Sequence, residues 1–226
     1  MSLDRISFAF ISFWLGGMVL SSSEVVLVNR NKIDSFRVGK DGCTNDTNAC
    51  PTSAICRISD GFCQCKSNTP TYQTFLLNTN GVRGLMYGCV SNSLIGPSSN
   101  NERNNCSFTT SNVIPFSHNS SPVKFSYNGS NVELKTTCRL VKAWTKTPNT
   151  AIETELEWMS DSYVSLNVSD NSLYFKWKMP MPELQGAIIH FSLKCENRSG
   201  QFESCLRGKV LGTWLAGMWG ARDSKF

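Results

Sequence analysis

Apolar and polar residues alternate with a period of two in several stretches of the C-terminal half of the chain. Leu173, Phe175 and Trp177, for example, are separated by single polar or amphipathic residues. The same alternation covers 132–140, 152–158, 164–168 and 187–195, at intervals of roughly 10–20 residues with turn-forming residues between them. Because successive side chains of a strand point to opposite faces, each stretch predicts a half-buried strand. Helical periodicity is poor, so we predict an antiparallel β-sandwich over 106–212.

The alternation also assigns a side to each residue of a predicted strand. In 152–158, the predicted inward side carries Ile152, Leu156 and Trp158, and the outward side carries Glu153, Glu155 and Glu157. In 187–195, the predicted inward residues are Ala187, Ile189, Phe191, Leu193 and Cys195, and the outward residues are Ile188, His190, Ser192 and Lys194. Asn167 falls on the polar side of its strand, where its side chain would reach water.

The N-terminus has the pattern of a targeting signal. An apolar run, ISFAFISFWLGGMVL, follows one basic residue and precedes Ser21, Ser22 and Ser23. Small residues at that point suit signal peptidase, so we predict a signal peptide over 1–23 with cleavage before Glu24. The alternative is an uncleaved anchor, but the run is shorter than the roughly 20 residues that span a bilayer.

Composition divides the rest of the chain. An N-terminal segment, 24–41, precedes a Cys-rich module, 42–90, which holds six of the ten cysteines. A Ser-, Asn- and Gly-rich stretch, 91–105, is typical of a linker. The β-sandwich domain, 106–212, follows, and an apolar and charged tail, 213–226, ends the chain.

An even number of cysteines behind a signal peptide predicts disulfide bonds. All ten follow residue 23, so five bridges are expected in an oxidising compartment. Neither a CxxC pair nor an HxxxH pair occurs, and the CxC at Cys63 and Cys65 is poor zinc spacing. We therefore expect no metal and no cofactor. The expected disulfide residues are Cys43, Cys50, Cys56, Cys63, Cys65, Cys89, Cys106, Cys138, Cys195 and Cys205.

The first six cysteines are spaced C-x6-C-x5-C-x6-C-x-C-x23-C, with Gly61-Phe62 before the fourth. This ladder resembles the epidermal growth factor (EGF)-like modules. The resemblance implies the pairs Cys43–Cys56, Cys50–Cys63 and Cys65–Cys89, whereas sequence alone leaves 15 pairings open. The last loop is long for the family and lacks its Gly-aromatic-x-Gly turn. The calcium-binding pattern of the family is also missing, so we interpret Asp41 and Asp60 as turn formers beside glycines.

The remaining four cysteines permit three pairings. One is local, Cys106–Cys138 with Cys195–Cys205, where Ser199-Gly200 would form a hairpin. A second pairs Cys138 with Cys195 across the sandwich and Cys106 with Cys205. It resembles immunoglobulin-like domains, with Trp144 or Trp158 as the core tryptophan. We favour the local pairing.

Six Asn-x-Ser/Thr sequons lie behind the predicted signal, and together they predict N-glycosylation. They begin at Asn45, Asn105, Asn119, Asn128, Asn167 and Asn197.

No set of residues has the pattern of a catalytic site. GxSxG, HExxH and P-loop motifs are absent from the sequence. His118 lies in a polar loop and His190 on a predicted outward face, so both are interpreted as exposed structural residues. Glu153, Glu155 and Glu157 are interpreted as a solvated strand face. We predict that the protein is not an enzyme; the alternative is a secreted hydrolase built around His190.

The net charge of +5 is scattered, with no basic cluster interleaved with aromatics, so nucleic acid is not an expected partner. The expected partner is an extracellular protein or glycan, and contact with a membrane is left open. The apolar run 210–219 could be a final strand, an interfacial segment or the remnant of a membrane span. We predict a secreted, extracellular, non-enzymatic glycoprotein of the matrix or cell surface. The alternative is a soluble or truncated ectodomain of a receptor-like membrane protein.

Overall fold

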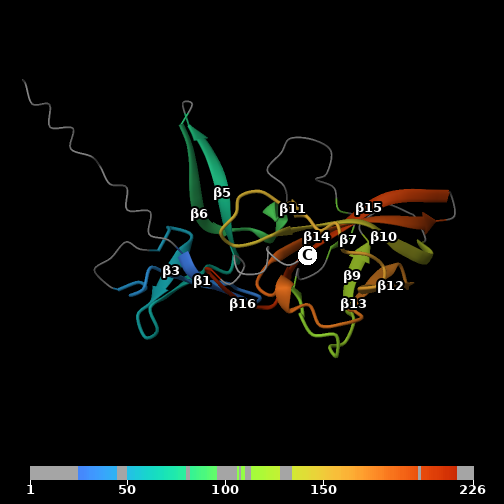
Figure 1. Ribbon diagram of the computed structural model, residues 1–226, viewed down its shortest axis with the longest axis horizontal. Helices are drawn as coiled ribbons and strands as arrows, with labels where there is room; N and C mark the ends of the chain where they lie inside the picture. The colour runs from blue at the N-terminus through green and yellow to red at the C-terminus, as the bar shows by residue number, and fades with distance from the viewer. Residues whose placement is uncertain are drawn as a thin grey trace, which may run out of the picture.

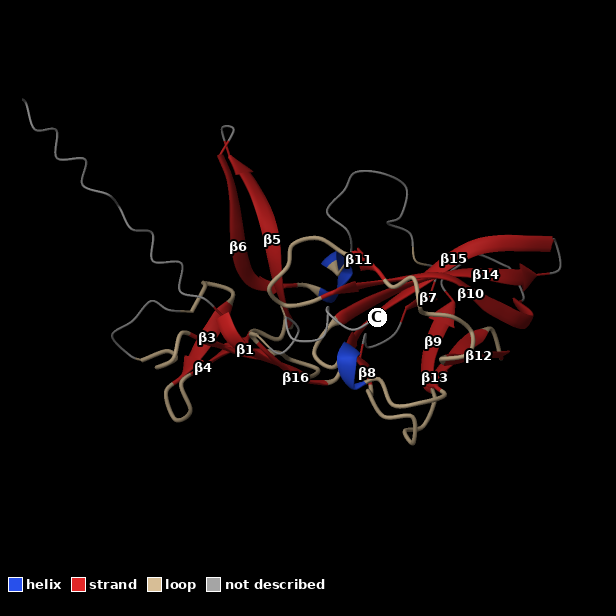
Figure 2. Cartoon of the chain, viewed as in Figure 1, coloured by secondary structure: helices blue, strands red, loops and turns tan. Residues whose placement is uncertain are grey.

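The computed structural model describes residues 25–44, 50–79, 82–95, 106, 108–109, 113–127, 134–197 and 200–217. The predicted signal peptide, 1–23, lies outside the described residues, as does most of the predicted linker. Strands dominate, and the described helical turns are two short 3-10 segments, as Figure 2 shows. The predicted fold class is confirmed: the chain is mainly β, with a disulfide-rich region and a larger sandwich-like β region (Figure 1).

Strands from both ends of the chain form the first sheet. Its order is β16-β1-β2-β4-β3, and every described pairing in it is antiparallel. The strands are β1 (Val25–Arg30), β2 (Ser35–Val38), β3 (Ala54–Arg57), β4 (Phe62–Cys65) and β16 (Gly212–Leu215). The segments that the sequence separates as 24–41, 42–90 and 213–226 therefore share one sheet.

The larger sheet has the order β7-β9-β13-β12-β10-β14-β15-β8, with β11 beside β10. Its pairings are antiparallel except for β15 with β8, which is parallel. Its strands are β7 (Phe108–Thr109), β8 (Val113–Ile114), β9 (Val123–Tyr127), β10 (Leu134–Lys146), β11 (Thr154–Glu155), β12 (Val164–Ser169), β13 (Ser172–Trp177), β14 (Ile188–Asn197) and β15 (Gly200–Val210). The 3-10 turns are η1 (Asn92–Leu94) and η2 (Pro182–Leu184).

This sheet curls until its ends meet. β7 begins the order and β15 lies near its other end, yet β7 contacts β15. Cys106, two residues before β7, is bridged to Cys205 in β15. The apolar side chains on the inside of the curl form one core that includes Phe125, Trp177 and Phe191. A second, smaller core lies under the first sheet.

Alternation predicted β13 correctly. Leu173, Phe175 and Trp177 are each at most 2% exposed, while Tyr174 and Lys176 between them are half-buried. One face of this strand covers the core and the other is partly open to water. Alternation with a period of two indicates a strand in this environment.

Alternation misassigned two other stretches. On β14, the predicted outward residues Ile188 and His190 are each only 3% exposed, because both faces of this part of the strand are covered. In 152–158, only Thr154–Glu155 forms a strand, and the predicted inward residues Ile152 and Trp158 are 68% and 43% exposed. The adjacent Met159, which the pattern did not select, is buried in the core instead.

All ten cysteines are bridged. The Cys-rich region has the three pairs that the EGF-like resemblance implies, Cys43–Cys56, Cys50–Cys63 and Cys65–Cys89. The resemblance itself remains a prediction. In the larger region the favoured local pairing is wrong.

There the bridges are Cys106–Cys205 and Cys138–Cys195. Cys138 and Cys195 face each other on the neighbouring strands β10 and β14, so this bridge does not cross the sandwich as in the immunoglobulin-like alternative. Among the described residues, the tryptophan in the larger core is Trp177, and neither Trp144 nor Trp158 belongs to that core.

Candidate functional site

His190 lies in a buried polar cluster. Its Nδ1 is 3.4 Å from Glu153 Oε2, and its ring lies against Trp144 with centroids 5.0 Å apart. Burial lowers the pKa of the nearby Lys146 and Arg207, and the Glu153 carboxylate partly offsets the effect on each. Glu153 thus compensates buried cations and is not part of the predicted solvated face. Glu155 and Glu157 are exposed as expected, with Glu155 paired to Lys142 at 2.9 Å.

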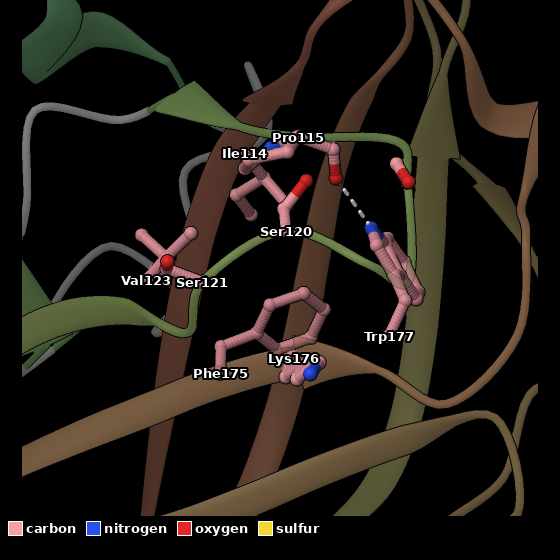
Figure 3. A pocket seen from close by; sticks show the side chains of 9 residues that line it. Ile114, Pro115, Ser120, Ser121, Val123, Phe175, Lys176 and Trp177 are labelled. Atoms are coloured by element: carbon pink, nitrogen blue, oxygen red, sulfur yellow. Dashed lines mark hydrogen bonds between the residues drawn. The ribbon is translucent and has the colours of Figure 1, made fainter.

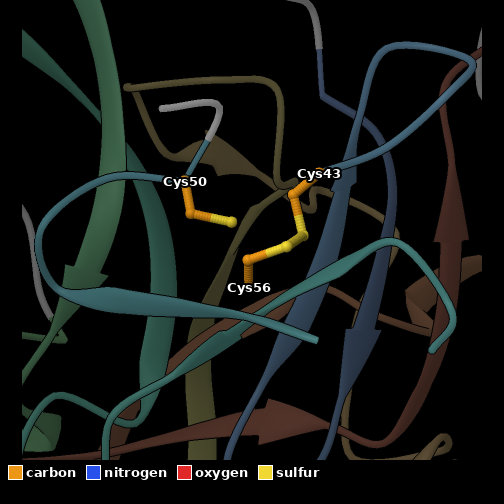
Figure 4. Close-up of side chains that lie close together, drawn as sticks. All are labelled: Cys43, Cys50 and Cys56. Carbon is orange, nitrogen blue, oxygen red and sulfur yellow. A yellow bond between two sulfur atoms is a disulfide. The ribbon is translucent and has the colours of Figure 1, made fainter. Parts of the chain in front are cut away.

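Two groups of side chains in the described residues have metal-like proximity, and disulfides explain both. The ligand atoms of Cys106, Cys205 and His190 lie within 4.8 Å of one another, as do those of Cys43, Cys50 and Cys56 (Figure 4). Every one of these sulfurs is bonded to another sulfur. None is therefore a thiolate, the form in which cysteine binds a metal.

Asp60 acts as a turn former. It accepts a hydrogen bond from the backbone N–H of Phe62 at 3.2 Å and pairs with Arg57 at 2.6 Å. The following Gly61 has a φ of +71°, which favours glycine. Asp41 is exposed at the neighbouring turn, where the backbone N–H of Cys43 donates to the Gly61 carbonyl at 2.9 Å. His118 is half-buried in the loop before β9.

A small pocket in the larger sheet is too small for a metabolite. It is lined by Pro115, Ser120, Trp177 and their neighbours, and its volume is about 10 Å³ (Figure 3). Its wall is fixed by a hydrogen bond from Trp177 Nε1 to the Pro115 carbonyl, 2.8 Å long. A volume of this size holds about one water molecule.

A buried ion cluster joins the two sheets. Arg30 of β1, Asp34 and Lys209 of β15 are each at most 1% exposed. Asp34 pairs with Arg30 through Oδ2 and with Lys209 through Oδ1, the latter at 3.0 Å. Burial lowers the pKa of Lys209, and the Asp34 carboxylate opposes this shift. Two buried cations therefore depend on one buried anion.

Backbone carbonyls complete this cluster. Arg30 donates to the carbonyls of Gly186 and Tyr72 at 2.9 and 2.6 Å, and Lys209 donates to those of Lys32 and Pro70 at 3.1 and 3.3 Å. These bonds come from several segments of the chain, so the cluster connects β1 and β15 to the loops around them.

The strands β5 (Thr71–Thr79) and β6 (Val82–Val90) form a hairpin whose base is fixed between the two sheets. The Cys65–Cys89 bridge ties β6 to β4. Asp34 accepts a hydrogen bond from the backbone N–H of Tyr72, and Thr74 Oγ1 donates to the Pro148 carbonyl at 2.5 Å. The base is thus bound to segments from both halves of the chain.

The outer half of the hairpin has no such contacts in the described residues. Leu76, Leu85 and Met86 are 50%, 64% and 45% exposed. Figure 1 shows the two strands standing away from the rest of the molecule. Sequence analysis missed this hairpin, although Asn80-Gly81 between two β-rich runs is a turn signal that could have found it. It is the main candidate binding surface of the chain.

Tyr72, at the hairpin base, is expected to make the stability of the protein fall at alkaline pH. Burial raises the pKa of Tyr72 from 10.0 to about 12. The folded state therefore favours the neutral phenol, and its stabilising contribution is complete below pH 10 and lost as the pH rises towards 12. We expect unfolding by urea to show a loss of about 2 kcal/mol over this interval in the native protein.

Tyr72→Phe, which cannot ionise, should lack this loss. Lys146 and Lys209, whose pKa values are lowered, contribute a stability change of the opposite sign as the pH rises towards 10.5. Both proteins carry these lysines, so their effect cancels in the difference. Equal alkaline slopes in the two proteins would contradict the assignment to Tyr72.

The structure places two of the six sequon asparagines. Asn119, in a turn, and Asn167, on β12, are both exposed. Asn45, Asn105 and Asn128 lie outside the described residues, and the side chain of Asn197 is likewise not described.

In the described part of the chain, no helix is long and apolar enough to cross a membrane. The apolar run that begins at Val210 continues into the strand β16, which pairs with β1. Val210 and Trp214 are 0% and 2% exposed, so folding accounts for their apolar character.

Comparison with known proteins gives no match: no protein-family model, curated protein or solved structure matches the chain.

Proposed function

We propose that the chain is a secreted, non-enzymatic extracellular glycoprotein that binds a partner in the matrix or at a cell surface. The observation that carries the proposal is the pairing of all ten cysteines into five bridges, a feature of proteins that fold in oxidising compartments. The EGF-like module, with its three predicted pairs, is part of this proposal.

Two further observations support it. The described sequon residues Asn119 and Asn167 are both exposed, as glycan acceptors must be. The hairpin presents apolar side chains to solvent, which is a common property of binding surfaces. His190, on which the hydrolase alternative depends, is only 3% exposed.

Expression of the full chain in secretory eukaryotic cells tests the proposal. We expect secreted protein without free thiols, and a loss of one glycan mass for each of Asn119→Gln and Asn167→Gln. Asn31→Gln is the matched control, because Asn31 is exposed but not part of a sequon. Cell-retained protein, free thiols or an unchanged mass in both sequon variants would refute it.

A further inference from the structure

The Cys106–Cys205 bridge lies beside an ionisable side chain. The two sulfurs and one ring nitrogen of His190 lie within 4.8 Å of one another. The sheet register brings them together: His190 of β14 lies opposite Arg207 of β15, and Cys205 is two residues from Arg207. The three side chains therefore share one face of the sheet. In the described part of the chain, no other bridge has a histidine or an acidic side chain this close to both of its sulfurs.

His190 also has an acidic partner. Its Nδ1 is 3.4 Å from Glu153 Oε2, and the two side chains are 3% and 10% exposed. Glu153 can therefore compensate the positive charge of a protonated His190, although Lys146 and Arg207 interact with the same carboxylate. Lys209, two residues further along β15, has its own anion in the buried ion cluster. With Nδ1 paired to Glu153, the proton on Nε2 is the one available to a sulfur.

These groups match the needs of thiol–disulfide exchange. In this reaction a thiolate attacks one sulfur of a bridge, and the other sulfur leaves faster when the pKa of its thiol is lower. A cationic imidazole beside a thiol lowers that pKa. Cys106 is half-buried and Cys205 is 8% exposed, so Cys106 Sγ is the more accessible target. The leaving sulfur is then that of Cys205, within reach of His190.

We propose that the Cys106–Cys205 bridge is a thiol-exchange site, in which His190 gives a proton to the leaving sulfur and Glu153 positions His190. The thiolate of a small thiol forms a bond to Cys106 Sγ, and the bond between the two cysteine sulfurs breaks. Its electron pair goes to Cys205 Sγ, which takes the Nε2 proton of His190. The products are a mixed disulfide on Cys106, a Cys205 thiol and a neutral imidazole. This modification goes beyond the proposed function, which requires only that the five bridges form.

Incubation of the secreted, glycosylated full chain with reduced glutathione tests the proposal. Free thiols are alkylated at intervals without denaturant, and the peptides are identified by mass spectrometry. We expect glutathione on Cys106 and an alkyl group on Cys205. His190→Gln should slow this exchange at least about tenfold, because a positioned proton donor accelerates a reaction by about 100-fold or more. His118→Gln replaces the other histidine of the chain and should exchange at the native rate.

The pH dependence separates a proton donor from a residue that only packs against the bridge. Per glutathione thiolate, the rate at Cys106 should fall as the pH rises and His190 loses its proton, and His190→Gln should lack this fall. Glu153→Gln should move the fall to lower pH, because the imidazolium loses its anion. Lys146 and Arg207 are present in all these proteins, so they do not cause a difference between them.

Absence of glutathione from Cys106 in the folded native protein would overturn the proposal, and so would an unchanged rate and pH profile in His190→Gln. Equal exchange at all five bridges would assign the reaction to global unfolding and overturn it as well. Near-ultraviolet circular dichroism verifies that each variant is folded, and if His190→Gln is not, the pH profile of Glu153→Gln decides. The thiol content before glutathione is added tests the proposed function and does not depend on the exchange rate.

Discussion

Replacement of Asp34 by alanine is expected to lower the free energy of unfolding by about 3–5 kcal/mol. The variant leaves Arg30 and Lys209 buried without their anion, and both are at most 1% exposed. It also removes the acceptor for the backbone N–H groups of Asn31 and Tyr72. Urea unfolding with the disulfides intact measures the loss.

Two further variants test whether the buried, unpaired charges of Arg30 and Lys209 cause this loss of stability. Glu155→Ala breaks an exposed ion pair with Lys142 and should cost less than about 1 kcal/mol. Asp34→Ala combined with Lys209→Met removes one stranded cation as well, so it should be more stable than Asp34→Ala alone. The expectation would be contradicted if Asp34→Ala lowered the free energy of unfolding no more than Glu155→Ala does. It would also be contradicted if Asp34→Ala with Lys209→Met were less stable than Asp34→Ala alone.

Loss of the Cys106–Cys205 bridge should be comparably severe. The bridge spans 99 residues and joins β15 to the segment before β7, at the point where the curled sheet closes. The Cys138–Cys195 bridge lies inside this loop and shortens it in the unfolded chain. Chain-entropy reasoning then gives about 4 kcal/mol for Cys106→Ser with Cys205→Ser, measured by urea unfolding.

The matched control is Cys43→Ser with Cys56→Ser, which opens a loop of 13 residues. The same reasoning gives about 3 kcal/mol for this pair. If the long-range variant lost no more stability than the control, the closure of the sheet would be attributable to packing between β7 and β15 and not to the bridge.

Local sequence patterns predicted those strands whose two faces lie in different environments. β13 has one face in the core and one partly open to water, so its alternation was informative. The outer assignment of His190 failed because the side that alternation left to solvent is covered by Trp144 and by the polar cluster around Glu153. Alternation within one strand does not indicate that residues distant in the sequence will cover its outer face.

The ion cluster was missed for a related reason. Asp34 and Lys209 are 175 residues apart, and nothing local indicates that they meet. One signal was present, however: Arg30 has the same parity as the buried Val28 in β1, so the strand pattern places a charge on the core side. A charged residue at a core position predicts a buried partner, although it does not identify that partner.

The Cys-rich pairing was found through family resemblance, which contains long-range information that local alternation lacks. The favoured pairing of the other four cysteines used proximity in sequence. It failed because the sheet brings Cys106 beside Cys205 and Cys138 beside Cys195. The hairpin base shows the same limit, since Thr74 and Pro148 are 74 residues apart.

The pairing of β16 with β1 has a consequence for how the chain is made. Leu27 lies opposite Leu215, so β1 is synthesised before the other described strands, and its outer edge is paired only when β16 follows β15. Trp214, which fills the smaller core, arrives equally late. The N-terminal cysteine region therefore completes its own sheet only after synthesis of the larger one. A fragment that ends before β16 would leave the outer edge of β1 unpaired and the smaller core without Trp214.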